Sequence, residues 1–180
     1  MATNIVCAGF GGQGVLTAGL ILAKISVDAG KNVTWIPSYG SEMRGGTANC
    51  HIKISDEEIA SPFVRDIDVL IALNELAVDK FEGKVKAGGF MIVNSSIVCG
   101  KEFRKDIDIV PVPVTEVAAK AANPRGANLA MLGAFVEKTK LFEKEFFAQG
   151  IDDFFAGKGK VNPANAKCFY LGCALCHENQ

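Results

Sequence analysis

Residues 4–14 read Asn-Ile-Val-Cys-Ala-Gly-Phe-Gly-Gly-Gln-Gly, which is the apolar run of a buried strand followed by a cluster of glycines. Apolar residues with helical spacing follow from Gly14 to Ala29, and Gly30 is a typical helix stop. A second strand is expected from Lys31 to Ile36, before Pro37. Strand, glycine loop, helix and strand make a βαβ unit, and such crossovers imply a parallel sheet.

Gly9, Gly11 and Gly14 fit the spacing G-x-G-x-x-G between a strand and a helix. Glycine permits close backbone approach, and a helix N-terminus offers unpaired N–H groups to an anion such as a phosphate. A nicotinamide-binding enzyme also needs a carboxylate near the end of the second strand, and residues 33–38 contain none. Three interpretations stay open at this point: a dinucleotide site, a purely structural turn, and a site for another anion or a partner surface.

Composition narrows the class of protein. The chain has 180 residues, 49% of them hydrophobic, with a net charge of −1, which is typical of a globular protein. Without a basic block, neither nucleic acid nor an anionic membrane is an expected partner. Residues 5–23 are apolar, but five glycines and a glutamine argue against a spanning helix. The N-terminus carries no export signal, so we expect a cytoplasmic chain whose six cysteines are free thiols.

The rest of the chain alternates strands and helices. Polar and apolar residues alternate over 47–54, which predicts a half-exposed strand that turns at 55–57 into a short antiparallel partner at 58–60. Buried strands are expected at 68–73, 90–93 and 108–114. Helices are expected at 74–81, with Asn74 as the cap, and at 115–122, 128–138, 142–155 with a bend or break at Gly150, and 163–177. The predicted fold class is α/β: a three-layer Rossmann-like fold with a mostly parallel open sheet and a β-hairpin insertion around residues 47–60. We expect one domain over 1–180, with C-terminal helices at 142–177.

A second glycine-rich segment, Ser38–Asn49, reads Ser-Tyr-Gly-Ser-Glu-Met-Arg-Gly-Gly-Thr-Ala-Asn. Its Arg44 offers a planar fork of donors to a phosphate or carboxylate, and Gly45 and Gly46 allow close backbone approach. Because neighbouring parallel strands end at one edge of a sheet, we expect the 9–14 and 38–46 loops to meet there.

These two segments together resemble the gamma subunit of the 2-oxoacid:ferredoxin oxidoreductases that act on pyruvate, 2-oxoglutarate or 2-oxoisovalerate. The resemblance continues through 54–59, 68–74 and 128–135, and it departs at Ser41, where the family often has proline. It implies a cytoplasmic, heteromeric enzyme that converts a 2-oxoacid, coenzyme A and oxidised ferredoxin to acyl-coenzyme A, CO₂ and reduced ferredoxin. Substrate choice in the family lies mainly on other subunits, so this chain does not specify the 2-oxoacid.

The resemblance also implies a division of labour. Thiamine diphosphate and iron–sulfur clusters belong to the alpha, beta and delta-type partners, and ferredoxin reacts through the complex. The gamma chain has no catalytic or metal residue and no tightly bound cofactor, but it contributes subunit packing and is a candidate for binding coenzyme A. The residues that the resemblance and the loops nominate are Gly9, Gly11, Gly12, Gln13, Gly14, Ser38, Tyr39, Glu42, Arg44, Gly45 and Gly46. The alternative from another class is a free-standing nucleotide-binding oxidoreductase of Rossmann type.

Two further patterns have ordinary explanations. Cys173-Ala-Leu-Cys176-His177 matches a haem attachment pattern, but with Cys168 these residues fit small buried thiols on an amphipathic helix. His51 is expected to be a surface histidine on the polar face of its strand. A subunit purified alone exposes its apolar interface, so an isolated homodimer is one expected behaviour.

Overall fold

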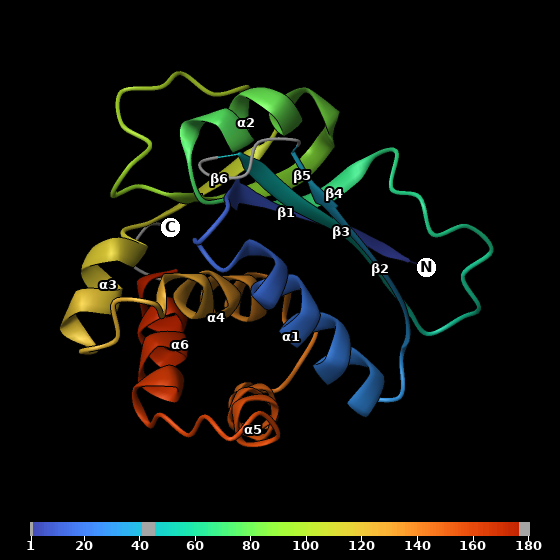
Figure 1. The fold of residues 1–180 in the computed structure, drawn as a ribbon. Helices are drawn as coiled ribbons and strands as arrows, with labels where there is room; N and C mark the ends of the chain where they lie inside the picture. The colour runs from blue at the N-terminus through green and yellow to red at the C-terminus, as the bar shows by residue number, and fades with distance from the viewer. Residues whose placement is uncertain (1, 41–45, 177–180) are drawn as a thin grey trace.

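A computed structural model describes residues 2–40 and 46–176, and within them the chain forms a six-stranded sheet in the order β2-β3-β1-β4-β5-β6 (Figure 1). The strands are β1 (Thr3–Phe10), β2 (Asn32–Tyr39), β3 (Thr47–Ser55), β4 (Ile67–Ala72), β5 (Val85–Asn94) and β6 (Asp108–Val112). The helices are α1 (Val15–Asp28), α2 (Glu75–Phe81), α3 (Val114–Lys120), α4 (Ala127–Thr139), α5 (Lys144–Ala156) and α6 (Ala164–Leu175). A 3-10 turn, Glu82–Lys84, follows α2.

The sheet is mixed, and its larger part is parallel as predicted. β1 pairs with β4, β4 with β5 and β5 with β6, all in parallel. β3 lies between β1 and β2 and is antiparallel to both. β1 and β2 therefore run in the same direction, but they are not the adjacent pair that a simple βαβ unit would give.

The predicted hairpin is present, but its partner strand is different from the one expected. β3 pairs over its whole length with β2, from Tyr39 opposite Ala48 to Asn32 opposite Ser55. Residues 58–60 do not form a strand. The preceding strand offers eight residues to the ladder, whereas the three residues after the turn could make very few hydrogen bonds, so the longer pairing prevails.

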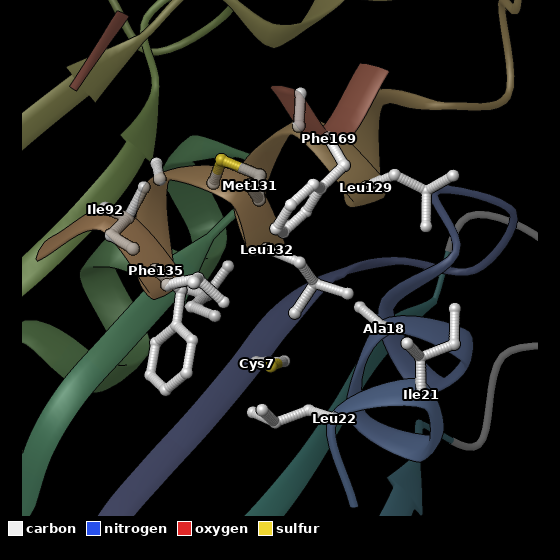
Figure 2. Packing of buried hydrophobic residues seen from close by; sticks show 14 of the residues in the cluster. Cys7, Ala18, Ile21, Leu22, Ile92, Leu129, Met131, Leu132, Phe135 and Phe169 are labelled. Atoms are coloured by element: carbon white, nitrogen blue, oxygen red, sulfur yellow. The ribbon is translucent and has the colours of Figure 1, made fainter. Parts of the chain in front are cut away.

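Two apolar layers cover the sheet, and the alternation of side chains along β1 separates them. Ile5 and Cys7 face the larger cluster, which is formed with α1, α4, α5 and α6. Val6 and Ala8 face a smaller cluster with α2. Figure 2 shows side chains of α1 and α4 converging near Cys7 in the larger cluster. The sheet is thus the middle of three layers, with most helices on one face (Figure 1).

The helices confirm most sequence-based boundaries. Asn74 caps α2, since its side-chain oxygen accepts a hydrogen bond of 2.8 Å from the Ala77 N–H. α5 does not end at Gly150, because it runs unbroken from Lys144 to Ala156. Glycine is needed there for space: a Cβ atom at residue 150 would lie 2.6 Å from Cγ1 of Ile25 on α1.

Candidate functional site

The two glycine-rich loops meet at one edge of the sheet, as the sequence predicts. The Gly11 N–H donates a hydrogen bond of 3.0 Å to the Gly46 carbonyl. The β3 strand that starts beside Gly46 pairs Thr47 with Phe10 at the end of β1. The contact arises from the antiparallel insertion of β3, because β3 must begin where β1 ends.

The side chain of Gln13 holds the first loop in shape. Its Oε1 accepts hydrogen bonds from the Phe10 N–H at 2.7 Å and from Nδ2 of Asn74 at 3.1 Å. Its Nε2 donates to the Leu73 carbonyl at 3.3 Å. These bonds tie the loop after β1 to the end of β4, so the Gln13 amide is engaged within the protein.

Glycine is present at different positions of this loop for different structural reasons. A Cβ at Gly9 would lie 2.7 Å from Oε1 of Gln13, so this glycine permits close packing. Gly14 precedes α1 with φ of 74°, and a Cβ there would lie 2.6 Å from Nδ2 of Asn128. Gly12 has φ of 97°, and no atom lies within 4 Å of the position that a Cβ would take, so its backbone borders open space. Of these glycines, Gly12 is the best placed for contact with a ligand.

A pocket of about 320 Å³ opens beside the N-terminus of α1. Among the described residues, no side chain caps this helix, and its first turn contains no acidic residue. The walls come from the glycine loop, the α3–α4 connection and the α5–α6 connection. The lining residues are Gly12, Gly14, Thr17, Asn123, Arg125, Asn128, Leu129, Phe155, Lys160, Asn162 and Asn165.

Buried amides fix the walls of this pocket. Asn128 donates from Nδ2 to the Gly14 carbonyl at 3.1 Å, which joins α4 to the glycine loop. Asn123 donates from Nδ2 to Oδ1 of Asn165 at 2.8 Å, which joins the α3–α4 connection to α6. All three asparagines are buried. Segments more than 100 residues apart in the sequence are thereby held in one wall.

The charge at this pocket is positive. Arg125 and Lys160 are exposed at its rim, and neither forms an ion pair within residues 2–40 and 46–176. Gly12 and Arg125 also line a neighbouring hollow of about 220 Å³, at the carboxyl ends of β4 and β5. Two cationic side chains and an uncapped helix N-terminus suit an anionic group such as a phosphate.

The residues that the sequence nominated for the site divide into four groups. Gly12 and Gly14 line the pocket, whereas Gly9, Gly11 and Gln13 shape the loop and Gly46 contacts it through its carbonyl. Ser38 lies on the opposite face of the sheet, beside α2, and Tyr39 is 73% exposed. Glu42, Arg44 and Gly45 lie outside the described residues.

Sequence reasoning missed Arg125 and Lys160. Both precede a predicted helix, in the stretches Asn123-Pro-Arg-Gly-Ala-Asn128 and Gly157-Lys-Gly-Lys160. A basic residue within a turn before a helix was the available signal. Only the fold brings these turns to the glycine loop.

The geometry argues against a nicotinamide-binding site. In a dinucleotide-binding fold the second strand is adjacent to the first, and its terminal carboxylate binds the ribose. Here β3 separates β2 from β1, and the end of β2 carries Ser38 and Tyr39 instead of an acid. The fold and site define an α/β protein with a glycine-rich loop between β1 and α1, in a variant where an antiparallel strand is inserted beside that loop.

The cysteines of α6 behave as core residues. Cys168, Cys173 and Cys176 are buried, and burial raises the pKa of the Cys173 thiol to about 12. Among the residues that the structure describes, no group of three or more His, Cys, Asp and Glu side chains is placed to hold a metal ion. His177 lies outside those residues. No helix in the described part is both long and apolar enough to cross a membrane.

Comparison with known proteins identifies the family. The chain belongs to the pyruvate ferredoxin/flavodoxin oxidoreductase family, whose sequence model matches residues 4–175. It is 37% identical over 178 residues to the ketoisovalerate oxidoreductase subunit VorA of Methanothermobacter marburgensis. That match covers 98% of this chain but only 37% of VorA, so the chain spans little more than a third of that relative.

Two solved structures share the fold. The gamma subunit of a keto/oxoacid ferredoxin oxidoreductase from Geobacter sulfurreducens matches with a TM-score of 0.81 and 25% identity, over 99% of this chain and 98% of that one. The 2-oxoglutarate:ferredoxin oxidoreductase of Magnetococcus marinus, solved with 2-oxoglutarate, coenzyme A and succinyl-CoA, matches with a TM-score of 0.88 and 26% identity. This second match covers 98% of our chain and 31% of that chain.

Proposed function

We propose that this chain is the gamma-type subunit of a thiamine-dependent 2-oxoacid:ferredoxin oxidoreductase. The complex would convert a 2-oxoacid, coenzyme A and oxidised ferredoxin to acyl-coenzyme A, CO₂ and reduced ferredoxin. Alpha, beta and delta-type subunits would supply thiamine diphosphate and the iron–sulfur clusters. The gamma chain would contribute to packing and would bind the phosphate-bearing part of coenzyme A.

The observation that carries the coenzyme A proposal is the open backbone of Gly12 beside the uncapped N-terminus of α1, opposite Arg125. When bound, coenzyme A supplies the thiol that accepts the acyl group. The chain's own residues would bind and orient the other end of the molecule: N–H groups and Arg125 would hold phosphate oxygens, with Lys160 at the rim. The volume of about 320 Å³ is in the range of ligand pockets and would take part of the cosubstrate.

The candidate residues that lie outside the described part of the chain remain part of this proposal. Gly45, Glu42 and Arg44 would complete the site from the second loop, with Arg44 as a further phosphate ligand. The cytoplasm is the proposed compartment, and the six cysteines, all of them free, are compatible with its reducing environment.

Steady-state kinetics of the assembled complex test the coenzyme A site. Arg125→Ala removes a charge-assisted hydrogen bond of ~1.5–3 kcal/mol, so the KM for coenzyme A should rise about tenfold to a hundredfold. The KM for the 2-oxoacid should change little, because that substrate would bind on other subunits. Arg44→Ala carries the same expectation.

Lys105→Ala is the matched control, because Lys105 is exposed in the loop before β6 and does not line the pocket. It should leave both constants unchanged. If Arg125→Ala instead releases the subunit while the KM for coenzyme A stays the same in the intact fraction, Arg125 is an interface residue. The chain would then act only in packing.

A further inference from the structure

A second basic hollow lies on the other face of the sheet, away from the glycine-loop pocket. α2 packs against β1 and β4, whereas α1 covers β2 and β3 from the opposite side. Between α2 and β3 is a groove of about 300 Å³, here named the α2–β3 groove. Its lining includes Asn49, His51, Phe63, Lys80, Phe81 and Lys84.

The positive charge of this groove is not neutralised within the described part of the chain. The Nζ atoms of Lys80 and Lys84 lie 5.3 and 5.7 Å from the centroid of the Phe81 ring, and neither lysine forms an ion pair with a described carboxylate. The two acids nearest these lysines in the sequence are engaged elsewhere: Asp79 pairs with Lys101, and Glu82 accepts a hydrogen bond of 2.9 Å from the backbone N–H of Arg104. Two like charges that converge without a counter-charge favour an anionic partner.

His51, on β3, lies close to the same two lysines. Its ring is half-buried and lies edge-on to Phe81, with 6.0 Å between ring centroids. Burial and the neighbouring Lys84 and Lys80 lower the pKa of His51. Burial is the larger cause of this shift, and the repulsion from the two lysines adds to it, as expected where their charges face the ring.

Besides its positive charge, the α2–β3 groove offers one polar and one apolar side chain for contact with a partner. Asn49 is only 4% exposed and lines the groove, and its side-chain amide has no hydrogen-bond partner among residues 2–40 and 46–176. Phe63 stands at the edge and is 69% exposed, which is unusual for so large an apolar side chain. The volume lies at the lower limit of ligand pockets, so it fits one or two inserted side chains better than a whole cofactor.

We propose that the α2–β3 groove is the docking site for an acidic segment of another subunit of the complex, in which a carboxylate side chain is flanked by an apolar one. The carboxylate lies between Lys80 and Lys84, the Asn49 amide binds the backbone of the segment, and the apolar side chain packs on Phe63. This inference rests on the proposed function, because it requires that the chain assembles with other subunits.

The test measures association of the full-length chain with its purified alpha and beta subunits by biolayer interferometry. Lys80→Glu with Lys84→Glu should raise the Kd by at least about tenfold, and Phe63→Ala should also weaken binding. The wild-type Kd should rise as salt increases from about 0.05 to 0.5 M, and the double variant should lose most of this dependence. Lys120→Glu, a charge reversal on the exposed end of α3, should leave Kd unchanged. Circular dichroism should show all variants folded, since these lysines are exposed.

Three outcomes would overturn the proposal, and they are distinguishable. If the wild-type chain does not associate with the subunits, the proposed function fails together with this inference. If the wild-type chain associates and the double variant binds equally well with the same salt dependence, only the docking site is wrong. If citrate or pyrophosphate raises the Tm of the isolated chain, this shift disappears in the double variant and assembly is unchanged, the groove binds a small anion.

Discussion

At the scale of single residues, the glycine loop shows that one motif combines several structural requirements. Gly14 needs a positive φ and space for Asn128, whereas Gly11 has an ordinary φ and its nearest neighbour is the Gly46 carbonyl, 3.8 Å from a Cβ position. Gly14→Ala should therefore lower the free energy of unfolding by ~1–3 kcal/mol through backbone strain and displacement of Asn128. Urea denaturation measures this loss, and Gly11→Ala is the control that should change stability little.

His51 gives the stability a dependence on pH with a defined sign. Its pKa is lowered from the usual 6.5 by burial and by Lys84 and Lys80. The unfolded chain therefore binds this proton more readily than the folded chain does. The resulting loss of folding stability is absent above pH 6.5 and grows as the pH falls through 6.5 to the folded-state pKa. Between pH 7.5 and 5.5, the Tm of the His51→Gln variant should fall less than the Tm of the wild type.

Titration by nuclear magnetic resonance checks the cause of this shift. Lys84→Gln removes one neighbouring charge, so the pKa of His51 should move back toward 6.5 in that variant. A wild-type His51 that titrates at or above 6.5 would contradict the explanation.

At the scale of secondary-structure elements, the sequence predicted which segments form strands and helices better than it predicted which strands pair. The alternation over residues 47–54 correctly placed Cys50 and Ile52 in the core and His51 on the other face. The same pattern did not identify the partner of this strand, because alternation fixes which face is buried but not which neighbour supplies the ladder. β2 and β3 are also linked at the end of their ladder, where the Gly40 N–H donates a hydrogen bond of 2.8 Å to the Thr47 carbonyl.

The crossing of α4 and α6 is an element-scale feature that depends on two glycines. A Cβ at Gly133 would collide with the Phe169 carbonyl on α6, and a Cβ at Gly172 would collide with the Ala130 carbonyl on α4. Gly133→Ala should force these backbones apart and destabilise the fold by ~1–3 kcal/mol, despite the better helix propensity of alanine.

Chemical denaturation of this variant has a matched control. Gly83, in the 3-10 turn after α2, has no atom within 4 Å of a Cβ position and no positive φ. Gly83→Ala should leave the unfolding midpoint nearly unchanged. Equal stability of the two variants would mean that the α4–α6 contact relaxes without cost.

At the scale of the whole molecule, the candidate site draws on segments that sequence order keeps apart. The glycine loop was predictable because its motif is local and the strand and helix beside it are strongly patterned. Arg125 and Lys160 reach it only through the packing of α4 and α6 and through the asparagine hydrogen bonds. No periodicity within one segment encodes such distant contacts, so the cationic half of the pocket could not be predicted from the sequence.

The proposed division of labour among subunits leads to a prediction for the whole chain. It spans 37% of VorA and 31% of the Magnetococcus enzyme chain, so most of each of those proteins has no counterpart here. The purified chain should therefore not reduce viologen or ferredoxin with pyruvate, 2-oxoglutarate or 2-oxoisovalerate in the presence of coenzyme A. The described pocket beside the glycine loop offers an arginine, a lysine and amides, which suit a phosphate.

Reconstitution decides whether this inactivity reflects a missing partner or a damaged protein. Adding the alpha, beta and delta-type subunits to the same preparation should give 2-oxoacid-dependent viologen reduction that requires coenzyme A. Arg125→Ala in that mixture should lower activity at limiting coenzyme A and recover it at saturation, because the lost interaction concerns binding of the cosubstrate. Robust reduction by the single chain would contradict the assignment, since every reacting group would then have to lie on these 180 residues.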